Sequence, residues 1–531
     1  MLHAKSAKAP DINTTTEING TSELLDDARL LQVSHYLLLG FCVAISLSIA
    51  LSQVLVVSLI LYWIAVRIKN FKHKNNSLNL LGDFPLFFAV PLATWLATSF
   101  VACIVGLSFT QALPELLKTT FYLLYPFCLY DILASPQISS EEAVRRIKSY
   151  FHAFFIGMSL AALHSVLSSA AGYLLPPKIP GPVTQSGQMV LLIPLLVAML
   201  LIYVTEARVS LTANTRLIER FCVAMSIILF FSFLSLAWPQ ILSSNNVRLV
   251  RLVVGTGLIV ILASGLVWTL ILRKNGLSYQ KQFETSLQLV FLSLTTAIIF
   301  AAFILNLKRG PWMGATIALS ILGVLISRRI LYSTAVALVF LVLIPPVRER
   351  IVDLSDHFVI HGGRMSMWLL GLELVGRFPL GLGTDNAAFM RELDPTLPLL
   401  HRHMHNNFLN IAVETGWIGL AAFIWWMLVS IGIGFRLWIS LQNTSANKES
   451  TIPPHQKEIA VLALALSCSL IGWQVSGLVE YNFGDGEIRL IAFMLMGLLL
   501  ALSRHFSPLE KPEKRSATPV PIGKLSRSRL H

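Results

Sequence analysis

His401-Arg-His-Met-His-Asn-Asn407 is a polar run that leads directly into the apolar segment Phe408-Leu-Asn-Ile-Ala-Val-Glu-Thr-Gly-Trp-Ile-Gly-Leu420. It closes residues 347–408, the longest hydrophilic interruption in a chain that otherwise consists mostly of apolar stretches. Three histidines and two asparagines at the mouth of an apolar helix are an unusual set to keep at a bilayer surface. This position suits chemistry on a substrate that a lipid carries.

The composition is that of an integral membrane protein. Of the 531 residues, 55% are hydrophobic and only 13% are charged, with a mean hydropathy of +0.69, whereas soluble proteins carry about 25% charged residues. The five cysteines all fall inside apolar runs without CxxC spacing, so we assign them no function. The net charge of +13 follows membrane topology rather than nucleic-acid binding, because the basic residues gather in the loops on one side.

Fourteen apolar runs are long enough, or nearly long enough, to cross a bilayer as helices. They predict an all-α polytopic membrane protein of about 12–14 transmembrane helices, with one long loop outside the cytoplasm that contains an amphipathic helix. The runs cover residues 36–50, 52–66, 84–109, 114–133, 151–174, 186–205, 218–240, 249–272, 287–306, 312–326, 330–346, 409–435, 459–479 and 488–503.

Basic residues in the connecting loops predict the orientation. With the N-terminus in the cytosol, most of the 41 Lys and Arg residues fall on the cytoplasmic side, where short loops carry an excess of positive charge. No secretory signal peptide is predicted. The segments are then a disordered cytosolic leader (1–34), an N-terminal transmembrane bundle (35–346), the long outer loop (347–408), C-terminal transmembrane helices (409–505) and a basic cytosolic tail (506–531).

This topology places four polar clusters, far apart in the sequence, at the same non-cytoplasmic end. They are Lys308–Trp312, Gly362–Arg364, His401–Asn407 and Glu480–Glu487. After the second cluster, five apolar residues recur at helical spacing and predict an amphipathic helix at the membrane interface: Met365, Trp368, Leu369, Leu372 and Val375. The Gly- and Pro-rich stretch 378–384 then predicts a turn.

Two arginines are candidates for binding an anion. Arg309 precedes Pro311, which favours the first turn of a helix, and helix N-termini bind anions that a guanidinium fork also fits. The alternative is an arginine that reaches lipid headgroups beside the interfacial Trp312. Arg364 opens the amphipathic helix, where a cation is unfavourable; the alternative there is a solvated charge.

His405 is the candidate general base. Asn406 or Asn407 can cap the helix that follows, and the positive helix end disfavours the imidazolium form, which leaves a neutral ring to accept a proton. The alternatives are a surface histidine that pairs with headgroups, or a metal site with His401 and His403, which alternate with it. Carboxylates that could support these groups are Glu414, Glu480 and Asp485.

Four of these stretches, in the same order, resemble motifs of the O-antigen ligase and polymerase family of bacterial envelope glycosyltransferases. The similarity covers roughly residues 290–500. Lys308 stands where the family more often has serine, and it adds positive charge beside Arg309. The stretches are Lys308-Arg-Gly-Pro-Trp312, Arg364-Met-Ser-Met-Trp368 with Pro379-Leu-Gly-Leu-Gly383, His405-Asn-Asn-Phe-Leu409 with Glu414-Thr-Gly416, and Gly477-Leu-Val-Glu-Tyr-Asn-Phe-Gly-Asp-Gly-Glu487.

The resemblance implies transfer of a glycan from undecaprenyl diphosphate to a lipid A–core sugar hydroxyl, at the periplasmic face of the bacterial inner membrane. Arg309 and Arg364 would hold the diphosphate, and His405 would act on the acceptor hydroxyl. The reaction would be inverting and need neither metal nor cofactor. Residues expected to support the site are Trp312, His403, Asn406, Glu414, Glu480 and Asp485.

Three alternatives share parts of this pattern. An O-antigen polymerase or a protein O-oligosaccharyltransferase of the same family would carry these motifs, although the protein-directed enzymes often have a large periplasmic domain after the membrane part. A transporter of a lipid-linked sugar or an anion is the alternative from another class. Transporters usually need ionisable groups at membrane depth, whereas the predicted spans are nearly free of charge and the polar residues gather at one mouth.

Overall fold

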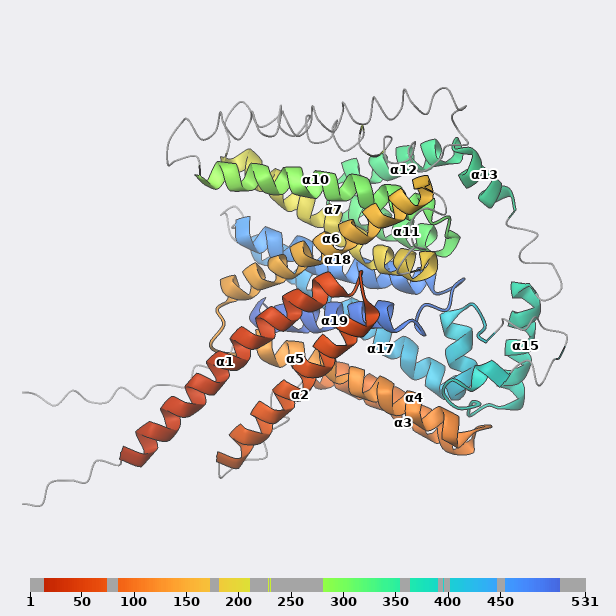
Figure 1. The fold of residues 1–531 in the computed structure, drawn as a ribbon, viewed down its shortest axis with the longest axis horizontal. Coiled ribbons are helices and arrows are strands. Elements are labelled where there is room, and N and C mark those ends of the chain that lie inside the picture. The colour runs from red at the N-terminus through yellow and green to blue at the C-terminus, as the bar shows by residue number, and fades with distance from the viewer. Residues whose placement is uncertain are drawn as a thin grey trace, which may run out of the picture.

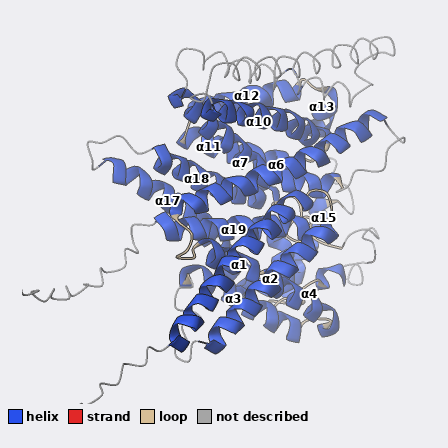
Figure 2. Cartoon of the chain, turned by 60° about the vertical axis from the view of Figure 1, so that its left-hand side comes forward, coloured by secondary structure: helices blue, strands red, loops and turns tan. Residues whose placement is uncertain are grey.

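The computed structural model describes residues 14–73, 85–171, 181–210, 280–353, 363–389, 402–446 and 454–506, together with residues 228, 230 and 395, and every regular element in these ranges is a helix (Figure 2). Helices α7, α10, α18 and α19 run along the horizontal direction of Figure 1, and α15 stands across their right-hand end. The helices are α1 (Thr14–Ala44), α2 (Ile49–His73), α3 (Leu86–Val105), α4 (Phe109–Tyr122), α5 (Leu124–Leu133), α6 (Ser140–Ala171), α7 (Pro182–Ser210), α10 (Gln280–Leu305), α11 (Arg309–Leu325), α12 (Arg328–Val342), α13 (Pro345–Val352), α15 (Arg364–Arg377), η4 (Asn386–Phe389), α17 (Asn407–Ala446), α18 (Pro454–Ser476) and α19 (Gly486–Phe506).

Eight of the described helices are long and apolar enough to cross a membrane: α2, α3, α6, α7, α10, α17, α18 and α19. Two shorter apolar helices cover Arg29–Ala44 and Arg309–Leu325. Twelve of the fourteen predicted spans fall on described helices, while the span predicted at 249–272, and that at 218–240 apart from residues 228 and 230, lie outside the described residues. The prediction of an all-α polytopic membrane protein is confirmed.

Two of the predicted spans are interrupted by proline. The span expected at 114–133 is divided into α4 and α5 because Pro126 has no N–H for the carbonyl of Tyr122, the last residue of α4. The span expected at 330–346 ends as α12 at Val342, and α13 begins at the Pro345–Pro346 pair.

The N-terminal leader also differs from its prediction. Residues 1–34 were expected to be disordered, but α1 begins at Thr14 and continues without a break to Ala44. Leu30 and Leu31 are buried, so apolar packing extends the membrane helix toward the N-terminus. Residues 1–13 and the tail after 506 lie outside the described residues.

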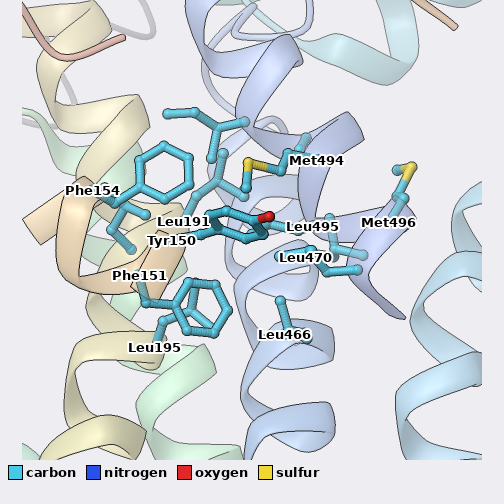
Figure 3. Close-up of a cluster of buried hydrophobic side chains, with 14 of the residues drawn as sticks. Tyr150, Phe151, Phe154, Leu191, Leu195, Leu466, Leu470, Met494, Leu495 and Met496 are labelled. Atoms are coloured by element: carbon cyan, nitrogen blue, oxygen red, sulfur yellow. The ribbon is translucent and has the colours of Figure 1, made fainter. Parts of the chain in front are cut away.

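The core lies where four helices meet. Helix α18 is central, since 89% of its membrane window is buried, and α2 is peripheral, with 33%. Figure 3 shows side chains of α6, α7, α18 and α19 that interdigitate there: Tyr150, Phe151, Phe154, Leu191, Leu195, Leu466, Leu470, Met494, Leu495 and Met496.

Helix α11 packs against α18 with little space between the backbones. A Cβ placed on Gly314 would lie 2.2 Å from the Gly472 carbonyl oxygen. Small residues allow such close approach of membrane helices. Because Arg309 begins α11, this contact also sets how far Arg309 lies from the end of α18.

We expect Gly314→Ala to lower the unfolding temperature of the detergent-solubilised protein, since overpacking costs about 1–3 kcal/mol. Gly432→Ala on α17 is the matched control, because a Cβ placed on Gly432 would meet no atom of the described residues within 4 Å. An unchanged unfolding temperature in Gly314→Ala would contradict the close packing.

Contacts at one end of the bundle join segments that are far apart in the sequence, and we call this the site end. The pairs are Arg364 with Glu480, Asn407 with Asn482, Thr184 with Asp485, and Gln111 with Asp385. The opposite end has its own pairs, Arg67 with Asp131, Lys148 with Glu206, and His505 with the Leu133 carbonyl. These pairs bring the second, third and fourth polar clusters together, and the side of the membrane that each end faces remains a prediction.

Candidate active site

Three consecutive residues, Glu480, Tyr481 and Asn482, connect the predicted motifs, and we call them the hub. The Arg364 Nη2 atom donates to Glu480 Oε1 at 3.1 Å. The Tyr481 ring lies 5.1 Å from the His403 ring, between centroids. The Asn407 side chain donates to Asn482 Oδ1 at 2.7 Å. The hub thus brings the second, third and fourth motifs together.

The two asparagines after His405, Asn406 and Asn407, have different structural roles. Asn406 is the cap of α17, since its side-chain oxygen accepts the Leu409 N–H at 3.0 Å. Asn407 is fully buried, donates its backbone N–H to the Gly477 carbonyl at 2.7 Å, and accepts the Phe483 N–H at 3.0 Å. Asn407 therefore fastens the start of α17 to the loop between α18 and α19.

Arg309 begins α11, as the Gly-Pro sequence predicted. Its Nη2 atom lies 3.8 Å from Asp353 Oδ2; this atom is buried and has no hydrogen-bond partner among the residues that the structure describes. The positive charges of Arg350 and Arg364 act on the Arg309 guanidinium. Three arginines from three helices thus concentrate positive charge at the site end.

Gly310 and Trp312 fix the position of α11. A Cβ on Gly310 would lie 2.8 Å from Glu480 Cγ, so only glycine lets α11 approach the hub this closely. Trp312 donates its Nε1 proton to the Phe303 carbonyl at 3.1 Å. Trp312 therefore ties α11 to α10.

The amphipathic helix predicted in the long loop is α15, but its apolar residues face two ways. Met367, Gly371, Leu374 and Val375 are buried, and Gly371 lies close to Leu409 and Met404. Three of the five apolar residues that predicted this helix are exposed: Met365, Leu369 and Leu372. Periodicity identified the helix, yet it does not distinguish a face that packs on protein from one that faces a bilayer.

The turn predicted at 378–384 fills a break in α17. At Gly416 the backbone leaves helical geometry with φ 73°. Leu382 N–H donates to the Val413 carbonyl at 2.9 Å, Gly383 N–H to the Glu414 carbonyl at 3.0 Å, and Trp417 N–H to the Pro379 carbonyl at 3.2 Å. The motif glycines allow this contact, because Gly381 and Gly383 also have positive φ.

His403 and His405 lie next to each other at the mouth of α17. Their ring centroids are 4.3 Å apart with the rings nearly perpendicular. His405 has φ 47°, in the left-handed region, and its backbone N–H donates to His403 Nδ1 at 3.3 Å. His401, the third member of the metal hypothesis, lies outside the described residues, and within them no three His, Cys, Asp or Glu side chains form a metal-binding group.

The supporting carboxylates occupy different places. Glu414 is buried and accepts the Asn410 side-chain amide at 3.0 Å. Glu480 belongs to the hub. Asp485 faces α7, where it accepts the Thr184 hydroxyl at 3.3 Å, and burial together with Glu487 raises its pKa to about 6. Glu414 is therefore linked to the histidine segment through Asn410 and Met404, while Asp485 makes a separate contact.

A buried ion pair at the site end was missed in the sequence. Arg489, in the first turn of α19, donates to Glu115 of α4 at 3.3 Å and to Thr119 at 3.0 Å. The signal was a single arginine at the start of an otherwise apolar run. Arg350 was also missed, because α13 is too short for its position beside Arg309 to be inferred.

The raised pKa of Asp485 predicts a pH dependence. Its folded pKa of about 6 exceeds the ordinary 3.8, so the folded state binds this proton more tightly and its contribution to stability is lost as pH rises from about 4 to 6. Asp485→Asn should raise the unfolding temperature at pH 7.5 and have little effect at pH 4. Glu373→Gln, on the exposed Glu373–Arg377 pair of α15, should show no such gain; equal curves for Asp485→Asn and the unsubstituted protein would contradict the prediction.

Comparison with protein families gives one match: residues 294–424 match the family described as O-Antigen ligase. This range includes Arg309, Arg364, His405 and the Gly416 break, and it ends before the hub. No curated protein matches the chain. The match supports the resemblance drawn from the motifs, and residues 294–424 of this chain are similar to the O-antigen ligase family.

Proposed function

We propose that this protein transfers a glycan from undecaprenyl diphosphate to a sugar hydroxyl of lipid A–core at the periplasmic face of the bacterial inner membrane. Transfer proceeds with inversion and without a metal or cofactor. The observation that carries the proposal is that Arg364, Gly310 beside Arg309, and His403 beside His405 all lie against the hub. All of these residues except the hub fall in the range that matches the O-antigen ligase family. Both termini then lie in the cytoplasm and the site end faces the periplasm.

In this proposal Arg309 and Arg364 bind the diphosphate of the donor. Each begins a helix, where free N–H groups and the helix dipole favour anions. Asp353 and Glu480 neutralise these arginines in the absence of substrate. The diphosphate replaces these carboxylates, and the arginines stabilise the charge that develops on it as the glycosidic C–O bond breaks.

His405 takes the proton of the acceptor hydroxyl. The acceptor oxygen attacks the anomeric carbon of the donor, and the electron pair of the broken C–O bond leaves with the diphosphate. Asn406, which caps α17, and His403, which accepts the His405 N–H, support the histidine. The apolar bundle holds the lipid tails of both substrates and so keeps their headgroups close together.

The alternatives differ in the acceptor or in the chemistry. A polymerase or a protein O-oligosaccharyltransferase would use the same residues with another acceptor. A transporter of a lipid-linked sugar or anion would need ionisable groups at membrane depth, but the buried Arg489–Glu115 pair lies at the first turn of α19. The polar residues at the mouth therefore favour an interfacial enzyme.

His405→Ala in the native host tests the proposal. We expect the long-chain lipopolysaccharide ladder to disappear from gels and undecaprenyl-linked O-antigen to accumulate, because the acceptor hydroxyl keeps its proton. His505→Ala, at the opposite end of the bundle, is the matched control and should keep the ladder. Both variants are compared at equal protein level in the membrane.

Two results would redirect the assignment. Core that carries a single repeat unit would indicate a polymerase. An unchanged ladder from fully expressed His405→Ala would remove the proposed role of His405 and reopen the transporter hypothesis.

Arg364→Lys tests whether binding of the diphosphate needs the shape of the guanidinium group or only its positive charge. Lysine keeps the positive charge but loses the planar fork that matches phosphate oxygens. With purified protein we expect the donor KM to rise about 10- to 100-fold, which corresponds to the loss of one charged hydrogen bond. Arg328→Lys, exposed just beyond the other end of α11, is the control; a donor KM unchanged in Arg364→Lys would contradict the diphosphate role.

A further inference from the structure

Met404 lies between the two site histidines in the sequence, and its side chain, its backbone N–H and its carbonyl each have a partner. Its side chain is fully buried among α15, α17 and the turn, in a cluster with Met367, Leu374, Val375, Leu382, Ala387, Ala412 and Val413. Its backbone N–H donates to Asn410 Oδ1 at 3.1 Å. Its carbonyl accepts the Trp368 Nε1 proton at 2.9 Å.

Asn410 is held in one orientation by a second hydrogen bond. It is fully buried, and its side-chain nitrogen donates to Glu414 Oε1 at 3.0 Å. Because the amide nitrogen of Asn410 donates to Glu414, its amide oxygen is left to accept the Met404 N–H. The Glu414 carbonyl is in turn held by Gly383 of the turn.

His405 follows this fixed residue in a conformation that L-residues avoid. Its φ of 47° lies in the left-handed region, which is unfavourable for a residue with a side chain and persists only where surrounding contacts determine it. The contacts here are the anchored Met404 peptide on one side and the Asn406 cap on the other. The His405 N–H also donates to His403 Nδ1, so a neutral His403 carries its proton on Nε2.

We propose that Asn410, oriented by Glu414 and opposed by Trp368, is a positioning residue for His405. Asn410 and Trp368 hold the backbone N–H and the carbonyl of Met404, and Glu414 orients Asn410; we call this arrangement the clamp. The clamp sets the left-handed conformation of His405 and directs its ring to the mouth of α17. The inference rests on the proposed function for its catalytic meaning, while its structural content concerns only the placement of His405.

Reversing the direction of the hydrogen bond between Asn410 and Glu414 tests the clamp. Asn410→Asp keeps an oxygen for the Met404 N–H but places a second carboxylate against Glu414. Adding Glu414→Gln restores the pair, because the introduced amide donates to the introduced carboxylate. Trp368→Phe removes only the donor to the Met404 carbonyl and offers a second variant that keeps an apolar ring.

The readout is the rate at which diethyl pyrocarbonate modifies His405 in the purified full-length protein, mapped by peptide mass spectrometry. His152 and His505, both far from the site end, serve as internal references. We expect a several-fold change in the His405 rate for Asn410→Asp and for Trp368→Phe, with the reference rates unchanged. The Asn410→Asp/Glu414→Gln double variant should return the rate to that of the unsubstituted protein.

Glycan transfer gives the second readout. The single variants should lower kcat with little change in the donor KM, and the double variant should recover kcat. An unaltered His405 rate in a folded single variant, or no recovery in a folded double variant, overturns the proposal. Chemical modification of His405 does not depend on glycan transfer, so the two proposals can fail separately. If the modification rates change as expected but His405→Ala still transfers glycan fully, the proposed function is rejected and the placement of His405 by the clamp stands.

Discussion

At Gly416, α17 leaves helical geometry, and the backbone hydrogen bonds that it gives up are made with the Pro379–Gly383 turn. In an apolar environment an unsatisfied N–H or carbonyl is costly, and irregular backbone persists only where other protein groups complete it. This requirement connects the long loop to the bundle. It also places the second and third motifs side by side, because the third motif contains the break at Gly416 and the second contains the Pro379–Gly383 turn that fills it.

The hub makes the second connection. Three consecutive residues contact α15, the histidines and the start of α17 in turn, and the absence of a side chain at Gly310 lets α11 approach them. Positive charge from separate helices therefore gathers beside a pair of histidines. Such a concentration of positive charge favours an anionic group, and Asp353 and Glu480 supply the anions in this structure.

Much of this arrangement could be predicted from the sequence. The basic loops placed four distant clusters at one end, and Pro311 and the Asn406–Asn407 pair indicated where two helices begin. The sequence did not indicate which asparagine caps α17, because both side chains can do so and only the contact of Asn407 with Asn482 separates them. It also did not reveal the partner of Arg489, since hydropathy contains no information on which helices meet. Nor did it separate the buried from the exposed apolar residues of α15, because leucine is equally suited to lipid and to protein.

The length of α11 has a consequence for the surrounding bilayer. Its 17 residues rise about 26 Å, whereas the hydrocarbon core of a typical bilayer is about 30 Å thick, and arginines flank both ends of the helix. Such a hydrophobic mismatch is relieved by local thinning of the lipid or by water that enters below the headgroups. Under the proposed function, this thinning would let water reach Arg309 and would shorten the path of the donor diphosphate to it.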